Sequence, residues 1–557
     1  MDRRLTFVVF AVVALAAAGG AYFRADAGAG KTSAQRPREK QVKPGECYDC
    51  HDVVKELNAG GKHAGVNCVN CHGGLEKHLK DPGPDTRPVT DVSWEACGRC
   101  HKEQYDSFMK EAYHRPARDE KSQLTGRAPN PFWDKLMMGH GFTKEHNATR
   151  SHKWMLIDYF AVDRAYGGRF QGKNGWRYIL DGGKAWDVLE DKFPGTNEHK
   201  PFLPQSAAAA NPVCLMCKTQ DNILKWGHMG DPAEGAQWSR KSNIVEFARS
   251  SQYGLNCFYC HDPHAAKPRI VRDAQIEALT EPNGDTLWHR DPKRTRFKVI
   301  EMGLRGFTRK IALLERYDTR LQCGQCHVEY NCNPGYDPRN PDTSKYSATM
   351  DDRRTNHFPF KDVLGLYDHY VNRVGSLDFK HALTGGLLWK AQHPEAETFY
   401  NSKHAKAGAG CDACHLPKIK DKKGKTFTSH FAVTPRLQLK ETCLKCHPGW
   451  SEEQARYAID SVKAHIRGKM RKAEFWLSSL IDKIVEAKKD NIAPEIISQA
   501  QDRHLKAHIL WEYWTAENSD GFHNPELARE SLTRSVDESQ RGIELLNEAL
   551  AEKKAAR

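Results

Sequence analysis

The chain has 557 residues, a formal net charge of +13 and a mean hydropathy of −0.72. Its one long apolar run spans residues 5–23, which excludes a polytopic membrane protein, and 10% aromatic residues argue against a disordered chain. The 17 cysteines and 27 histidines are the most informative residues, because so polar a chain needs more than aliphatic side chains to fill its interior.

The N-terminus has the pattern of an export signal. Arg3 and Arg4 precede the apolar run, and small-residue cleavage sequences follow at 16–18 and 25–27. We predict that residues 1–27 are a signal peptide and that residues 28–43 are a flexible linker. An uncleaved N-terminal anchor is the alternative, since the 19 apolar residues nearly span a bilayer.

Seven C-x-x-C-H motifs occur between residues 47 and 447. This spacing is typical of c-type haem attachment, in which two thiols bond one porphyrin and the adjacent histidine binds its iron. Zinc knuckles and a disulfide framework are poor alternatives, since neither explains a histidine after every cysteine pair. The motifs are Cys47/Cys50/His51, Cys68/Cys71/His72, Cys97/Cys100/His101, Cys257/Cys260/His261, Cys323/Cys326/His327, Cys411/Cys414/His415 and Cys443/Cys446/His447.

An eighth cysteine pair, Cys214 and Cys217, is followed by Lys218 instead of histidine. We interpret it as a haem whose proximal ligand is the Lys218 amine; a decayed or stray motif is the alternative. An uncommon ligand is expected where the iron does chemistry and does not only relay electrons. Eight ferric haems each add about one negative charge and lower the net charge to about +5, so we do not expect nucleic acid as a partner.

The motif density predicts the organisation of the chain. Residues 44–130 hold three haem motifs and 131–450 hold the other five, so we predict a trihaem domain and a catalytic pentahaem domain. From residue 451 the helical signals are strong: Ser451 begins a capping box with Gln454, and Pro494 and Pro525 are suited to the first turns of further helices. The predicted fold class is a mainly α multihaem cytochrome c with extensive loops, a haem-filled core and long C-terminal helices. We predict that residues 451–557 form a helical bundle that makes a homo-oligomer.

Five segments resemble the pentahaem, ammonia-forming cytochrome c nitrite reductases. The three additional N-terminal haems and Cys332 resemble the octahaem nitrite reductases more closely. Octahaem tetrathionate reductases also have a lysine-ligated haem and are the main alternative, whereas hydroxylamine oxidoreductases keep histidine at the catalytic haem, so Lys218 argues against them. The resembling segments are 214–218, 323–330, 390–395, 411–418 and 521–526.

The resemblance implies an active site above the Lys218 haem, with an open distal face surrounded by Arg164, Tyr330 and His393. Arg164 is a permanent cation that binds oxyanion oxygens, His393 carries a transferable proton near neutral pH, and Tyr330 supplies a hydroxyl donor. The alternatives are that Arg164 pairs with a haem propionate, that Tyr330 is a core aromatic, and that His393 is a loop histidine or an iron ligand.

The resemblance also implies a covalent bond and a metal beside this pocket. Cys332 is expected to form a thioether with the Tyr330 ring; a free buried thiol is the alternative. Ca²⁺ is expected to bind the side chains of Glu329 and Gln392 and the carbonyl oxygens of Tyr330 and Lys390, an oxygen-only set that suits a hard cation. A plain contact between Glu329 and a lysine is the alternative.

Each of the other seven irons needs a sixth ligand. The resemblance nominates His152, His404, His430 and His523 for the catalytic part. Spacing alone nominates His63, His78 and His114 for the three N-terminal haems.

From these residues we predict a periplasmic octahaem cytochrome that reduces nitrite to ammonium with six electrons from a periplasmic or membrane-bound donor. Hydroxylamine is the expected side substrate. A sulfur-oxyanion reductase acting on tetrathionate and a non-enzymatic electron carrier are the two alternative functions, and the carrier requires every iron to be six-coordinate.

Overall fold

The computed structural model describes residues 40–110, 132–139, 151–156, 170–172, 189–191, 215–220, 250–251, 253–302, 309–330, 358–375 and 377–556. The chain forms two compact units: one contains residues 1–43 and 67–96, and the other contains 44–66 and 97–557. The first and third haem motifs belong to the larger unit, and the domain boundary at residue 130 stays a prediction. The predicted signal peptide lies outside the described residues.

The smaller unit surrounds the second haem motif. Cys68 begins the short helix η2 (Cys68–Asn70), and Asn67 caps it by accepting a hydrogen bond from the Val69 N–H (3.2 Å). Strand β1 (His72–Gly73) then pairs antiparallel with β2 (Val89–Thr90). The cysteine pair is therefore followed directly by a strand that fixes the motif histidine. The unit also contains α4 (Leu75–Lys80) and η3 (Pro84–Thr86).

In the larger unit, each described haem motif forms about one helical turn. The N–H of the motif histidine donates to the carbonyl oxygen of the first cysteine in five motifs, for example from His327 to Cys323 (2.9 Å). One such turn brings the two sulfur atoms and the imidazole to the same porphyrin. The helices are α2 (Pro44–Tyr48), α5 (Trp94–Gly98), α14 (Cys257–Cys260), α17 (Thr319–Cys323), α21 (Cys411–His415) and α22 (Cys443–Cys446).

A four-stranded antiparallel sheet follows the fourth motif, and the sequence analysis did not predict it. Its strand order is β5-β6-β8-β7. A buried ion pair between Arg269 and Asp262 (2.7 Å) connects its first two strands, and α15 (Asp273–Thr280) packs against β8. The strands are β5 (His261–Asp262), β6 (Lys267–Ile270), β7 (Phe297–Met302) and β8 (Arg309–Leu314).

Short elements connect the remaining motifs. They include α3 (Asp52–Ala59), α6 (Lys102–Phe108), α8 (Trp133–Leu136), η4 (His152–Trp154), β3 (Phe170–Gly172), β4 (Leu189–Asp191), α16 (Leu287–Arg290), α18 (Val363–Tyr367), η7 (Asp368–Val374), β9 (Phe379–Lys380), β10 (Leu387–Leu388), α19 (Glu395–Tyr400), α20 (Lys403–Lys406), β11 (Lys418–Lys420), β12 (Thr426–Thr428) and η8 (Pro435–Leu437).

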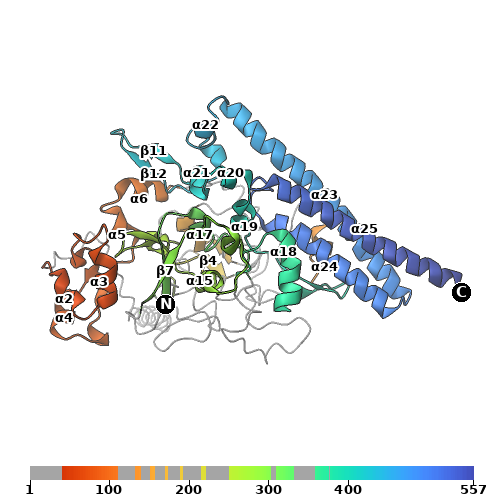
Figure 1. Cartoon of the computed structure of the whole chain (residues 1–557), viewed down its shortest axis with the longest axis horizontal. Coiled ribbons are helices and arrows are strands. Elements are labelled where there is room, and N and C mark those ends of the chain that lie inside the picture. Colours follow the sequence, from red (N-terminus) through yellow and green to blue (C-terminus); the bar gives the residue numbers. More distant parts are fainter. Residues whose placement is uncertain are drawn as a thin grey trace, which may run out of the picture. The chain divides into compact units, whose positions relative to one another are not determined.

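Three long helices end the chain and confirm the mainly α prediction: α23 (Glu452–Lys489), α24 (Pro494–Ala516) and α25 (Pro525–Ala555). They lie side by side (Figure 1). Ser451 forms the predicted capping box with Gln454, and the two prolines begin α24 and α25 as predicted. None of the described helices combines the length and the apolarity needed to cross a bilayer.

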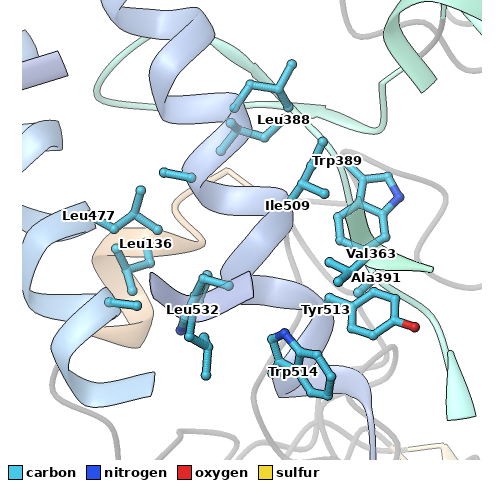
Figure 2. Packing of buried hydrophobic residues seen from close by; sticks show 14 of the residues in the cluster. Leu136, Val363, Leu388, Trp389, Ala391, Leu477, Ile509, Tyr513, Trp514 and Leu532 are labelled. Carbon is cyan, nitrogen blue, oxygen red and sulfur yellow. The ribbon is translucent and has the colours of Figure 1, made fainter. Parts of the chain in front are cut away.

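The long helices share one hydrophobic core with the segment that carries the candidate active site. Figure 2 shows Trp389 and Ala391 beside Ile509 and Tyr513 of α24. All four side chains are buried. Helix α24 therefore supports the backbone just before Gln392 and His393.

Gly542 of α25 marks the closest approach of these helices. A Cβ atom at this position would lie 2.7 Å from Cδ1 of Leu480 on α23. A Gly542→Val substitution is expected to lower the free energy of unfolding by about 1–3 kcal/mol, because the added methyl groups overpack the contact. Thermal denaturation followed by circular dichroism measures the change. Gly468→Ala on α23 is the matched control: nothing lies within 4 Å of its Cβ position, and this variant should be as stable as the native protein or more so.

Candidate haem ligands and active site

Four of the nominated histidines lie opposite a motif histidine. The ring centroids of these pairs are separated by a narrow range of distances. The pairs are His63 and His101 at 6.0 Å, His415 and His523 at 6.2 Å, His261 and His430 at 6.3 Å, and His152 and His327 at 6.5 Å.

Five of the eight histidines in these pairs use Nδ1 for hydrogen bonding. Nδ1 of His63, for example, donates to the carbonyl oxygen of Pro263 (2.7 Å). This bond leaves Nε2 available, which is the arrangement found for metal-binding histidines in proteins. The other Nδ1 partners are the Val433 carbonyl for His415 (2.9 Å), the Thr428 carbonyl for His430 (3.0 Å), Glu517 for His523 (2.6 Å) and Glu395 for His327 (3.4 Å).

Glu395 and Glu517 are carboxylates that orient two of these rings. Burial alone would raise the pKa of Glu395, but the adjacent His327 and His523 lower it to about 2. For His523, burial lowers the pKa of the imidazole, but the adjacent Glu517 carboxylate raises it above its ordinary value. Each carboxylate thus fixes the tautomer of the ring that it contacts.

Two other buried histidines, which we did not nominate, bond through Nε2. His381 donates from Nε2 to the Lys135 carbonyl (2.8 Å) and accepts the Thr384 N–H at Nδ1 (3.2 Å). Nε2 of His508 lies 2.7 Å from a Glu512 carboxylate oxygen. In both residues Nε2 is already hydrogen-bonded to another protein group, whereas the nominated histidines leave Nε2 available.

His381 gives a prediction for stability against pH. Burial, together with nearby positive charges, lowers its pKa to about 4 although its bond to Lys135 raises it. Between about pH 4 and the ordinary value near 6.5, the unfolded chain binds a proton that the folded chain does not, so the unfolding free energy falls as pH falls. From pH 7 to 5, the native protein should lose about 2 kcal/mol more than a His381→Asn variant. Denaturant titrations measure this difference.

The exposed His465 on α23 supplies the control for that experiment. A His465→Asn variant is expected to show the same loss of stability as the native protein over this pH range. If the His381→Asn and native curves run parallel, the buried neutral imidazole does not contribute to the acid sensitivity.

Lys218 is 8% exposed and lies in a turn that two haem motifs hold in place. The Tyr259 hydroxyl, from the fourth C-x-x-C-H motif, donates to the Met216 carbonyl (2.7 Å). The Cys217 thiol lies 3.6 Å from the carbonyl oxygen of Gln325, which belongs to the next motif. The amine that we nominated as iron ligand therefore lies within a rigid, buried junction of three attachment turns.

Two segments whose contacting residues Glu329 and Gln392 are 63 residues apart in the sequence run together beside this junction. The Gln392 N–H donates to a Glu329 carboxylate oxygen (2.8 Å), and the Ala396 N–H donates to the His327 carbonyl (2.9 Å). This pairing brings the segment of Tyr330 alongside the segment of His393. Tyr330 is buried and His393 is half-buried.

The nominated calcium ligands lie on these same two segments, in a buried and acidic environment. Glu329 is fully buried and accepts a hydrogen bond from the Tyr370 hydroxyl (3.0 Å). Glu397 is also fully buried and accepts the Glu329 N–H (2.9 Å), and its second carboxylate oxygen has no hydrogen-bond partner among the described residues. Burial raises the pKa of both carboxyls well above their usual values.

Arg272 is a candidate active-site residue that the sequence analysis missed. Its guanidinium is fully buried and lies 5.8 Å from the Tyr330 ring centroid and 5.3 Å from that of Phe358. None of its three nitrogen atoms has a hydrogen-bond partner in the part of the chain that the structure describes. Only the fold brings this charge to the tyrosine, so no local pattern indicates it.

Exposed cysteines occur at both ends of the series of motifs. Cys50 and Cys100 of the N-terminal motifs are exposed, as is Cys446 of the last motif, whereas His51 and Cys71 are half-buried.

The backbone of these N-terminal motifs nevertheless forms the attachment turn. The N–H of His51 donates to the Cys47 carbonyl (3.0 Å), and the N–H groups of Cys71 and Cys100 donate to the carbonyl oxygens of Cys68 (3.1 Å) and Cys97 (3.2 Å). Haem attachment at Cys50, His51, Cys71 and Cys100 stays a prediction from the motif, and the local attachment turn is present.

The remaining nominated residues are placed as follows. His404 stacks on Phe522 at 6.3 Å, and burial together with His447 lowers its pKa. In the smaller unit, Nδ1 of His78 lies 3.4 Å from the Thr86 hydroxyl and Nδ1 of His72 lies 3.2 Å from that of Thr90. The nominated residues outside the described ranges are His114, Arg164, Cys214 and Cys332.

Two sequence relatives match most of this chain. The chain is 25% identical over 454 residues to cytochrome c nitrite reductase subunit NrfA of Nitratidesulfovibrio vulgaris, over 76% of this chain and 70% of the relative. It is 25% identical over 474 residues to cytochrome c-552 of Haemophilus influenzae, over 83% and 74% of the two chains.

The fold is also similar to a solved structure and matches a family model. The structure is a cytochrome c nitrite reductase from Desulfovibrio desulfuricans with two calcium sites; the TM-score is 0.57 at 20% identity, over 82% of this chain and 86% of the other. The model of the Cytochrome c552 family matches residues 174–557, which include the Lys218 turn, the paired segments and the long helices. The chain therefore belongs to the Cytochrome c552 family.

Proposed function

We propose that this protein is an octahaem cytochrome that reduces nitrite to ammonium at a haem bound by Lys218. The observation that carries the proposal is the junction at which the Lys218 turn, two C-x-x-C-H turns and the Tyr330 and His393 segments meet. The similarity to a nitrite reductase subunit over most of both chains supports the same reaction.

The histidine geometry fits haem. Two metal–nitrogen bonds of about 2 Å each put the centroids of opposed imidazoles roughly 6 Å apart. Each of the four pairs, at 6.0–6.5 Å, would hold one haem iron between its two rings. We assign His63 to the haem of His101, His152 to that of His327, His430 to that of His261, and His523 to that of His415. His447 is then the remaining motif histidine of the catalytic part, and His404 is assigned to its haem.

Contacts between cysteines of different motifs support a continuous path for electrons. Three such pairs have side-chain contacts, and each pair belongs to two different haems. Together with the bond from Tyr259 to Met216, they connect the motifs of His101, His261, Lys218, His327 and His415 in one chain of neighbours. The pairs are Cys97 and Cys257, Cys217 and Cys326, and Cys323 and Cys411.

The acidic environment fits a hard cation. The described residues contain no metal cluster of three or more His, Cys, Asp or Glu side chains. The proposed Ca²⁺ ligands have a different composition: the carboxylate of Glu329, the amide of Gln392 and the carbonyl oxygens of Tyr330 and Lys390. A divalent cation there would neutralise the buried carboxylates of Glu329 and Glu397. Without a cation, the burial of these two negative charges is energetically costly.

When bound, the haem of Lys218 supplies an iron that binds nitrite and the electrons that reduce it. The protein's own groups act on the oxygen atoms. His393 donates protons to them, and the Tyr330 hydroxyl donates a hydrogen bond that stabilises the negative charge. Arg164 holds the anion, and Arg272 lies against the Tyr330 ring and fixes its position beside the pocket.

The cellular context is part of the proposal. The signal predicted at residues 1–27 directs the protein to the periplasm, where a periplasmic or membrane-bound donor supplies electrons. The long C-terminal helices are the expected homo-oligomer interface. Hydroxylamine is expected as a second substrate, since it is a more reduced nitrogen compound of similar size.

The decisive assay is nitrite-dependent oxidation of a reduced viologen with ammonium measured as product. We expect six viologen electrons per ammonium formed and eight haems per chain in a pyridine haemochrome assay. Turnover of tetrathionate that exceeds turnover of nitrite in the same preparation would instead indicate a sulfur-oxyanion reductase.

A further inference from the structure

A lysine-rich hairpin lies next to the last haem motif. Strands β11 and β12 pair antiparallel and are joined by a tight turn in which Asp421 accepts the N–H groups of Lys423 and Lys425 (both 2.8 Å). Gly424 has φ +80°, which the turn requires. The hairpin thus holds its lysines at fixed positions. They are Lys418, Lys420, Lys422, Lys423 and Lys425.

These five lysines are exposed and form no ion pair with a described carboxylate. The single acidic residue of the hairpin, Asp421, is occupied by the backbone of its own turn. By contrast, two neighbouring basic residues are neutralised: Lys440 pairs with Glu452 (3.3 Å), and Arg436 pairs with Asp460. The hairpin is therefore a concentrated positive surface, here called the basic hairpin.

The basic hairpin is connected to the haem-attachment turn α22. The Lys445 amine, within the last motif, donates to the Lys418 carbonyl at the start of the hairpin. Lys445 and Cys446 are exposed, and so are Pro448 and Trp450 just beyond the motif (Figure 1 shows α22 near the hairpin). Trp450 stacks on the His447 ring with centroids 4.3 Å apart and planes at 17°. An exposed aromatic ring thus lies in face contact with the proposed iron ligand.

We propose that the basic hairpin and Trp450 are the docking site of an acidic one-electron carrier protein, which delivers electrons to the haem of His447. The inference rests on the proposed function. Exposed charge of one sign steers an oppositely charged partner, and an aromatic residue surrounded by charge is typical of a protein interface. Contact between the basic hairpins of two copies of this chain is disfavoured, because their like charges repel each other.

The test compares two donors for nitrite reduction: an acidic flavodoxin and a reduced viologen dye. The variant carries Lys420→Glu, Lys422→Glu and Lys423→Glu. Its flavodoxin-driven kcat/KM and its flavodoxin affinity by titration calorimetry should each fall about tenfold or more at low salt. The difference should shrink at high salt, because screening weakens the exposed charges. Viologen turnover should not change.

The control variant carries Lys472→Glu, Lys489→Glu and Lys554→Glu, an equal charge change on exposed lysines of α23 and α25. It should bind flavodoxin like the native protein. Equal flavodoxin affinities of the two variants would overturn the proposal. So would a basic-hairpin variant that loses binding to anionic phospholipid vesicles but keeps flavodoxin-driven turnover. Native protein without viologen-driven nitrite reduction would instead refute the proposed function itself.

Discussion

A Lys218→His variant is expected to keep eight haems but to lose at least about tenfold in viologen-driven nitrite turnover, equivalent to ~1.4 kcal/mol of transition-state stabilisation. The side chain lies 8% exposed in a turn that Tyr259 and Gln325 fix from either side. An imidazole is shorter than the lysine side chain and rigid, so it cannot reach the same position without moving this turn.

The haem content distinguishes this effect from a failure of assembly. A pyridine haemochrome assay should give the same eight haems in the variant as in the native protein. Lys472→His on the exposed surface of α23 is the control and should keep full activity. Full nitrite turnover by the Lys218→His variant would contradict the role of the amine.

A Glu329→Gln variant is expected to lose at least about tenfold in calcium affinity and to lose nitrite turnover with it. The amide keeps the size of the carboxylate and one acceptor oxygen for the Tyr370 hydroxyl. It removes the negative charge that a calcium ion needs. Plasma emission spectroscopy measures the calcium content. Nitrite turnover is measured after calcium is removed by a chelator and again after calcium is added back.

Glu512→Gln provides a matched control for calcium binding. Glu512 is as buried as Glu329 and accepts the Ala391 N–H (3.2 Å), but it is not a proposed calcium ligand. We expect this variant to keep its calcium. If Glu329→Gln also keeps a full complement of calcium, the ion is absent from this site.

The sequence predicts the parts of the fold that depend on local chemistry. Covalent haem attachment needs two thiols and a ligand within five residues, and the capping box of α23 closes between Ser451 and Gln454. Such signals are complete within one turn. Helical periodicity then predicts the long C-terminal helices, because their apolar positions recur at a fixed spacing.

The parts that were missed depend on residues far apart in the chain. Strands β5 and β6 have two and four residues, too short for an alternating pattern, and β6 pairs with β8 only after the intervening chain folds back. Arg272, the N-cap residue of α15, lies beside Tyr330, and Glu397 contacts Glu329 across 68 residues. No spacing rule connects such positions, so only the fold identifies them.

The account depends on one haem with an amine ligand and a free coordination position, and electron paramagnetic resonance of the ferric protein tests it most directly. We expect a high-spin signal from one haem per chain, together with low-spin signals from the bis-histidine haems. The high-spin signal should change when nitrite is added. In the Lys218→His variant it should be absent or altered. A spectrum in which every haem is low-spin and unchanged by nitrite would contradict it.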